Sequence, residues 1–232
     1  MSAPHATVHD IKQTLFIYQD DELAPSQTQG YKVGQERSLA ELSQLDKEDE
    51  SLQRWKASLG LNADNATTFG PKKVVPIALF LEAATLNKTV SLDLTLGKDG
   101  LAKYKKEPIT IKEGAEFSVG IKFRVENQIV SGMKYLQVVK RTGMTGKNRF
   151  SRGNGVHRAE ADRSSAPTVD KMEEMIGSFG PQKEPYTKIF AAEEAPSGML
   201  ARGTYGVRSR MIDDDATVFL DFEWSFKIAK DW

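Results

Sequence analysis

The amino-acid sequence predicts an all-β protein, an immunoglobulin-like antiparallel β-sandwich, with a flexible N-terminal arm that carries two short helices. Two observations predict this fold class. From residue 73 onward, apolar and polar residues alternate with a period of two, which is typical of strands with one buried and one solvated face. These segments, about eight in number, are short and separated by turn-forming residues, which favours two packed sheets.

The last expected strand shows this alternation most clearly. Between Val218 and Ile228 every second residue is apolar, and Asp221, Glu223 and Lys227 lie between them. We therefore expect one face of this strand in the core and the other in water. The remaining expected strands cover residues 74–81, 90–96, 109–111, 117–125, 134–139, 187–190 and 204–211.

The arm and its helices precede the sandwich. Residues 1–37 contain few periodic apolar residues and a run rich in Pro, Ser, Gln and Thr, so we expect a flexible arm. Residues 38–60 read as a helical pair: a capping box begins at Ser38, Asp46 is the expected N-cap of the second helix, and Gly60 ends it. Residues 61–72 are the expected linker to the sandwich at 73–232. Both helices are short, so we expect them to need a partner surface.

One segment interrupts the sandwich pattern. Residues 143–168 are rich in Gly, Ser and Arg and show no period. A loop of this length in a compact domain is functional or disordered. We expect a loop insertion at 145–168, with a disordered hairpin tip as the simplest interpretation.

Composition excludes several classes of protein. Lys and Arg number 32 and Asp and Glu also 32, so the chain lacks the overall basic excess of a nucleic-acid binder. It has no cysteine, which excludes disulfides, thiol nucleophiles and cysteine-bound metals. The sequence shows no apolar run of about 20 residues and no secretory signal, so we expect a cytoplasmic protein without stable membrane insertion.

Catalytic machinery is also not recognisable. The three histidines lie in the arm and the insertion, and the sequence shows no phosphate-binding loop, zinc motif or nucleophile elbow. Neighbouring carboxylates, such as Asp221 and Glu223, could serve a carbohydrate-cleaving sandwich, but their alternation with core residues makes them the solvated face of a strand. We predict no enzymatic activity, no cofactor and no metal site.

Five separated blocks of the sequence carry a family resemblance. They are LDKEDESL at 45–52, IVSGMKY at 129–135, IGSFGP at 176–181, EEAPSGMLARG at 193–203 and DDD at 213–215, and the closing FEW and KDW fit as well. In order and spacing these blocks resemble the Rho GDP-dissociation inhibitors, and the resemblance extends from about residue 30 to Trp232. It implies a protein that binds prenylated, GDP-bound Rho-family GTPases, slows GDP release, extracts them from membranes and keeps them soluble.

The resemblance implies a switch-binding site in two parts. Asp49 and Ser51 would hydrogen-bond the first switch loop of the GTPase, and Trp55 matches an aromatic position that is usually tyrosine, so only stacking remains there. Asp214 and Asp215 would meet an arginine of the second switch. A switch loop held in its GDP conformation cannot open to release nucleotide. From the residues alone, the same positions are helix caps and a hairpin turn.

The resemblance also implies a pocket for the farnesyl or geranylgeranyl group between the two sheets. Glu193 and Glu194 would meet the basic tail that precedes the prenylated cysteine. Each pocket residue also lies where an ordinary core residue would, so the core remains the alternative. By position, the implied pocket residues are Leu81, Ile109, Phe117, Ile129, Val207 and Trp224.

Two other functions remain open. The main alternative is a general prenyl or lipid carrier of the same sandwich fold that does not contact the switch loops. The other is a sandwich that binds or cleaves carbohydrate. We expect a monomer whose partners are the GTPase and its lipid group.

Overall fold

The computed structural model describes residues 22–26, 30, 45, 48–58, 73–86, 89–142 and 168–232. The predicted linker at 61–72 and nearly all of the predicted first helix and insertion lie outside these residues. In the described part of the chain, no helix combines the length and the hydrophobicity needed to cross a membrane.

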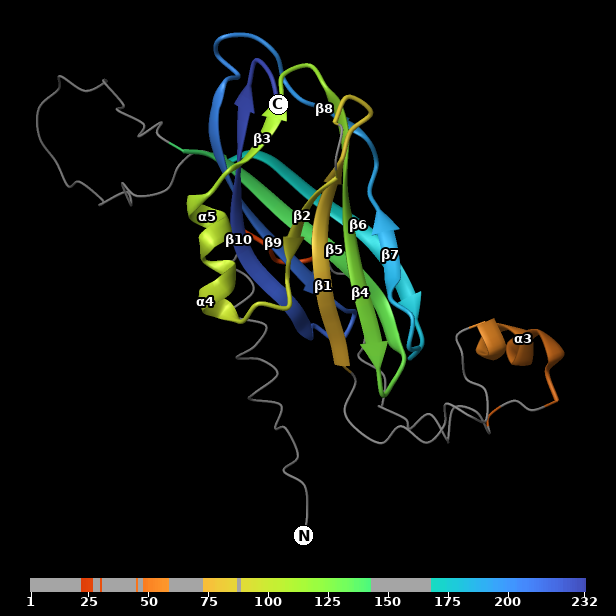
Figure 1. Ribbon diagram of the computed structural model, residues 1–232. Helices are drawn as coiled ribbons and strands as arrows, with labels where there is room; N and C mark the ends of the chain where they lie inside the picture. Colours follow the sequence, from red (N-terminus) through yellow and green to blue (C-terminus); the bar gives the residue numbers. More distant parts are fainter. Residues whose placement is uncertain are drawn as a thin grey trace, which may run out of the picture.

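In the described part of the chain, ten strands form two packed sheets, which confirms the predicted β-sandwich (Figure 1). The first sheet has the order β2-β1-β4-β7, with β8 also paired to β4. Its strands are β1 (Lys73–Glu82), β2 (Val90–Asp93), β4 (Glu116–Glu126), β7 (Tyr186–Ile189) and β8 (Glu193–Glu194). The second sheet has the order β3-β10-β9-β5-β6. Its strands are β3 (Ile109–Lys112), β5 (Val130–Arg141), β6 (Thr168–Phe179), β9 (Gly203–Ile212) and β10 (Val218–Ala229).

The expected antiparallel pairing holds for every described strand pair except one. β3 runs parallel to β10, with Ile109 opposite Phe226. A parallel pair cannot be joined by a tight hairpin, and here a long stretch of chain separates the two strands. Alternation alone does not reveal strand direction, which explains why the sequence did not show this pair.

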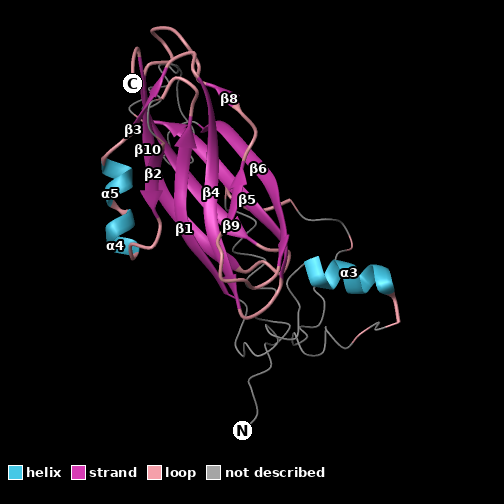
Figure 2. Cartoon of the chain, turned by 45° about the vertical axis from the view of Figure 1, so that its right-hand side comes forward, coloured by secondary structure: helices cyan, strands magenta, loops and turns pink. Residues whose placement is uncertain are grey.

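Two short helices, which the periodicity did not predict, follow β2. α4 (Lys98–Leu101) and α5 (Lys103–Lys106) lie along β10 at one side of the sandwich (Figure 2). The Tyr104 hydroxyl accepts a hydrogen bond from the backbone N–H of Asp93, and the Ser225 hydroxyl donates to the carbonyl groups of Tyr104 and Lys105. The helices therefore link β2 of one sheet to β10 of the other. Each has four residues, too few to show a helical period.

β6 is an edge strand that the sequence analysis did not predict. Thr168, which the analysis assigned to the insertion, is its first residue, and most of its side chains are exposed. It is held by backbone pairing to β5, from Lys140 opposite Thr168 to Val130 opposite Phe179. Because such a strand buries little apolar surface, it carries no clear alternating pattern.

The core lies between the sheets and follows the predicted alternation. Ile121, Phe123 and Val125 of β4 have no exposed surface. Tyr135 of β5 stacks on Phe190 with ring centroids 4.5 Å apart. The inward faces of both sheets thus form one apolar layer, as expected for a sandwich.

The N-terminal arm departs from the expectation in one stretch. Residues 22–26 lie against the outer face of the second sheet, near β9 and β5, where the segment is drawn in red in Figure 1. Leu23 is fully buried in a cluster with Leu136, Val138 and Ile212. Five residues of the predicted arm thus have defined contacts with the sandwich, because one leucine meets an apolar patch that only the folded sheet creates.

α3 (Glu50–Ser58) corresponds to the predicted second helix but begins later than expected. The Asp49 carboxylate accepts hydrogen bonds from the backbone N–H groups of Ser51 (2.8 Å) and Leu52 (3.1 Å). These contacts make Asp49 the N-cap in place of Asp46. The acidic run contains several residues able to cap, so the sequence alone did not select among them.

Candidate functional site

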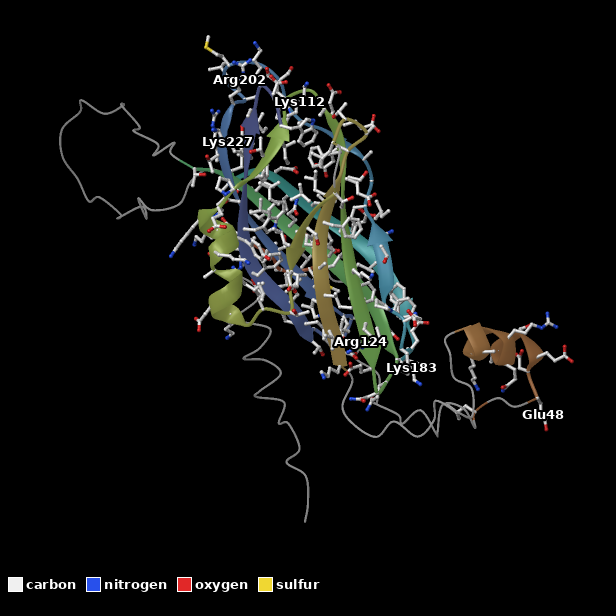
Figure 3. All side chains as sticks on the ribbon, viewed as in Figure 1. Glu48, Lys112, Arg124, Lys183, Arg202 and Lys227 are labelled. Carbon is white, nitrogen blue, oxygen red and sulfur yellow. The ribbon has the colours of Figure 1, made fainter. Side chains whose placement is uncertain are left out.

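An apolar cavity of about 120 Å³ lies between the two sheets, beside the short pairing of β8 with β4. Two of the six predicted pocket residues line it, Phe117 from β4 and Trp224 from β10. Figure 3 labels Lys112 and Arg202 at this end of the sandwich and Arg124 and Lys183 at the other. The structure thus places an apolar cavity at one end of the molecule.

The other four predicted pocket residues do not line the cavity. Leu81 is buried in a small cluster with Ile111 and Ala195, against which Phe117 packs. Val207 is a core residue opposite Trp224. Ile109 is only partly buried against the main core, and Ile129 is half-buried just before β5. These four residues therefore lie in the ordinary core or are partly buried outside the cavity.

The cavity has lining residues that the sequence analysis missed. Several follow from the alternation, because residues two and four positions after Trp224 share its face. Others could not be found in this way, since they come from strands whose neighbours were unknown. The missed residues include Val119, Gln137, Val139, Tyr205, Phe226 and Ile228.

A buried polar network holds the Trp224 ring. Its indole N–H donates to the Ser209 hydroxyl at 3.0 Å, and the Tyr135 hydroxyl lies 2.8 Å from Ser209 and 3.0 Å from the Gln137 side-chain oxygen. Burial raises the pKa of Tyr135, so the phenol stays neutral. Because each buried polar group has a partner, the network fixes the orientation of the indole at the cavity wall.

Carboxylates form the rim of this cavity. Glu193 and Glu194, both predicted to meet a basic tail, line it together with Asp170. Partial burial raises the pKa of Glu193, and the negative charges of Asp170 and Glu174 raise it further. This rim has an excess of negative charge, which favours a cationic partner.

A second, wider groove adjoins the cavity. It has a volume of about 460 Å³ and is lined by Glu82, Leu86, Glu116 and Ile189 among others. Phe117 lines both spaces. Phe117 is therefore shared by the cavity and the wider groove.

The acidic turn at 213–217 lies at the opposite end of the β9–β10 hairpin from the cavity. The Asp213 carboxylate accepts hydrogen bonds from the backbone N–H groups of Asp215 (3.0 Å) and Thr217 (2.8 Å), which fixes the turn. Asp214 as a whole residue is exposed. Its carboxyl loses part of its contact with water, which raises the pKa, while the positive charge of Lys134 opposes this shift. The turn thus displays Asp214 and Asp215 while Asp213 supports it from within.

The α3 residues form the third predicted group. Asp49 and Ser51 are exposed in the first turn of the helix. The Asp49 carboxylate caps the helix through one oxygen, so its charge remains at an exposed helix start. The backbone of Trp55 belongs to α3, and its side chain lies outside the described part of the structure.

The carboxylates considered for catalysis are engaged in ion pairs. Both Arg208 and Arg210 donate to Asp221, at distances of 2.6–3.0 Å, and Lys105 contacts Glu223. Among the described residues, no group of three or more His, Asp or Glu side chains is placed to hold a metal ion.

These features define a ligand-binding β-sandwich: an apolar cavity between the sheets, a carboxylate rim and a separate acidic turn. Comparison with known proteins shows the family to which the chain belongs. The sequence profile of the family described as "RHO protein GDP dissociation inhibitor" matches residues 17–151 and 155–231. The chain therefore belongs to the Rho GDP-dissociation inhibitor family, whose members are regulators rather than enzymes.

Three relatives illustrate the similarity. The chain is 36% identical over 200 residues to the Rho GDP-dissociation inhibitor of Schizosaccharomyces pombe, covering 86% of each chain. It is 36% identical over 233 residues to Rho GDP-dissociation inhibitor 1 of Homo sapiens, covering 100% of this chain and 99% of that one. It is 33% identical over 206 residues to the inhibitor of Saccharomyces cerevisiae, covering 86% of this chain and 90% of the relative.

Proposed function

We propose that this chain binds prenylated, GDP-bound Rho-family GTPases, slows their GDP release and carries them through the cytosol as a monomer. Inhibition of GDP dissociation is the function of the family. The lipid group, the switch contacts, the location and the monomeric state are the specific parts of this proposal.

One observation carries the proposal: an apolar cavity with two glutamates at its rim. The C-terminal tail of such a GTPase would present a lipid group next to basic residues, and both features have a counterpart here. Phe117 and Trp224 supply the dry wall, and Glu193 and Glu194 supply the negative charge. The combination fits a prenylated basic tail better than it fits an uncharged lipid.

The cavity must widen to accept a prenyl group. A space of about 120 Å³ is smaller than the roughly 300–1,000 Å³ of typical ligand pockets. The adjoining groove has a volume of about 460 Å³, and Phe117 lines both spaces. We propose that rotation of the Phe117 ring joins them when the lipid enters.

Burial of the lipid does not by itself drive extraction from a membrane. Each buried methylene contributes about 0.8 kcal/mol in a bilayer, and a dry protein pocket offers a similar gain. The transfer is therefore close to neutral, and contacts with the GTPase must shift the equilibrium. In this proposal Asp49, Ser51 and Trp55 of α3, with Asp214 and Asp215 of the turn, make these contacts with the switch loops.

The lipid part of the proposal is tested by filling the cavity. Val139 lines it and is 7% exposed, so Val139→Phe should weaken binding of a soluble prenylated peptide at least tenfold. Val218→Phe, at a site 37% exposed on the far end of β10, is the matched control and should bind normally. Unchanged binding by a folded Val139→Phe variant, or equal affinity for a peptide without the lipid, would exclude this pocket.

The switch-binding part requires a variant that keeps the helix cap. Asparagine caps helices about as well as aspartate, so Asp49→Asn removes the charge and retains the cap, whereas Asp49→Ala removes both. Together with Asp215→Asn, it should speed GDP release from the bound GTPase. If release stays fully inhibited, the chain is instead a prenyl carrier that leaves the switch loops alone. Turnover of an oligosaccharide would support the carbohydrate alternative.

A further inference from the structure

The segment Glu22–Ser26, which we call the anchor segment, is fixed to the outer face of the second sheet by apolar and polar contacts. Leu23 is 0% exposed and packs on Leu136, Val138 and Ile212. The Leu23 carbonyl accepts a hydrogen bond from the Arg210 guanidinium at 3.1 Å, and Arg210 is itself buried. A fully buried leucine with a satisfied carbonyl is a specific docking contact.

Charged groups hold both ends of the anchor segment. At its start, Glu22 pairs with Lys140 at 2.6 Å. At its end, Ser26 donates from its N–H (3.0 Å) and its hydroxyl (2.5 Å) to the Glu173 carboxylate. Lys134 donates to the Ser26 carbonyl at 2.8 Å and pairs with Glu173 at 3.1 Å. The segment thus contacts β5 through the Glu22–Lys140 ion pair and β6 through the hydrogen bonds from Ser26 to Glu173.

The anchor segment also borders the acidic turn. Ala216 of the turn packs against the same cluster as Leu23, and Ile212 of that cluster is the last residue of β9 before the turn. The positive charge of Lys134, which holds Ser26, also acts on Asp214 and favours its charged form. Removal of the anchor segment would therefore expose one wall of the turn and leave Lys134 with fewer partners.

We propose that the anchor segment is a structural part of the GTPase-binding face: it fixes the acidic turn and ties the chain that precedes α3 to the sandwich, with Lys134 as the positioning residue. This inference rests on the proposed function of the turn. With residue 26 held on one side and β1 on the other, α3 lies in a section of chain attached at both ends. Such attachment raises the effective concentration of α3 near the surface it serves.

The test uses the full-length chain with substitutions in the anchor segment. Leu23→Asp places a charge in a dry site, and Ser26→Asp places a carboxylate against Glu173. Leu23→Met conserves volume and polarity and is the matched control. Loss of amide-exchange protection at residues 22–26 checks that each aspartate variant releases the segment, and because Ser26 is exposed, its variant tests the proposal without disturbing the core.

Two affinities separate the possible outcomes. We expect both aspartate variants to bind a GDP-loaded prenylated GTPase about three- to tenfold more weakly, with Leu23→Met unchanged and all variants binding a soluble prenylated peptide equally. Unchanged or higher affinity for the GTPase after release would overturn the inference. Failure of the proposed function is a different result, in which Asp215→Asn has no effect on GDP release in the parent chain.

Discussion

Gly132 shows how a single residue couples β5 to the acidic turn. Its φ of +59° lies in the left-handed region, and a Cβ at this position would lie 1.6 Å from a carboxylate oxygen of Asp214. Glycine is therefore required both by the backbone conformation and by the neighbouring side chain. The position lies within the IVSGMKY block, so part of that block serves the geometry of the turn.

Gly132→Ala should destabilise the fold by about 2 kcal/mol, because it combines backbone strain with a displaced Asp214. Urea unfolding measures the change. Gly206→Ala is the control: its nearest atom beyond neighbouring residues is 4.0 Å away, and we expect a change within about 0.5 kcal/mol. Equal stability of the two variants would show that Asp214 moves aside without cost.

Glu193 should make the affinity for a basic peptide depend on pH, and the direction of that dependence follows from its pKa. Its pKa is raised above the ordinary 4.5 by partial burial and then by Asp170 and Glu174. On acidification it therefore takes up its proton earlier than an isolated glutamate and loses its attraction for a cation. We expect the affinity for a Lys- and Arg-rich peptide to begin falling above pH 4.5 as the pH is lowered from 7.

The matched variants for this prediction are Glu193→Gln and Glu184→Gln. The first should bind the basic peptide more weakly at pH 7 and show a flatter pH profile, and the second, at an exposed position away from the cavity, should behave like the parent. Higher salt should weaken binding by the parent chain, because rim charges are screened. A pH profile unchanged by Glu193→Gln would contradict the assignment.

At the scale of elements, the outward face of β10 carries two carboxylates in different settings. Asp221 receives bonds from two arginines, one of which, Arg210, has a side chain only 5% exposed. Glu223 pairs with Lys105 of α5, and both side chains are at least half exposed. Burial alone would raise the pKa of Asp221, but hydrogen bonds from Arg208 and Arg210 outweigh it and hold the pKa below its ordinary value.

Asp221→Asn should therefore cost about 2 kcal/mol in unfolding free energy, because it removes a negative charge that pairs with buried Arg210. Glu223→Gln should cost less than about 0.5 kcal/mol, as expected for an exposed pair. Since the folded-state pKa of Asp221 is lowered, its contribution is present above the ordinary 3.8 and is lost as the pH falls through the depressed value. Equal costs for the two variants, measured by urea unfolding, would argue against a special role for Arg210.

At the scale of the whole molecule, the cavity and the acidic turn lie at opposite ends of the sandwich. The cavity lies among the later residues of β10, such as Phe226 and Ile228, and the acidic turn precedes the first residue of that strand, Val218. The proposed lipid and switch sites therefore lie at opposite ends of one hairpin. A GTPase bound at the turn would reach the cavity only with its tail.

A ligand that enters the cavity should stabilise the entire fold. Binding only to the native state adds about 2.7 kcal/mol at a ligand concentration of 100 Kd. For a domain of this size we expect a rise in Tm of roughly 5–10 °C with a soluble prenylated peptide. A peptide without the lipid, or the Val139→Phe variant with the lipid, should show a much smaller rise in a calorimetric scan, and equal shifts would place the lipid elsewhere.

The inward and outward residues of the main strands could be predicted from the sequence, since alternation depends only on the two-residue period of a strand. This is why β10 and the core residues of β4 were predicted correctly. Phe117 and Trp224 were named as pocket residues because of the family resemblance, and alternation could not add Gln137 and Tyr205 to them. A cavity depends on which strands become neighbours, and alternation within one strand contains no information about the strand opposite.

The order and spacing of the sequence blocks were enough to identify the family, and the run of alternating residues was enough to predict a sandwich. The tertiary structure alone decided the parallel pairing of β3, the position of α4 and α5, the edge strand β6 and the docking of Leu23. The physical reason is the same in each case. The local sequence pattern depends only on the geometry of a single strand or helix. These features, in contrast, depend on surfaces that exist only after distant strands have come together.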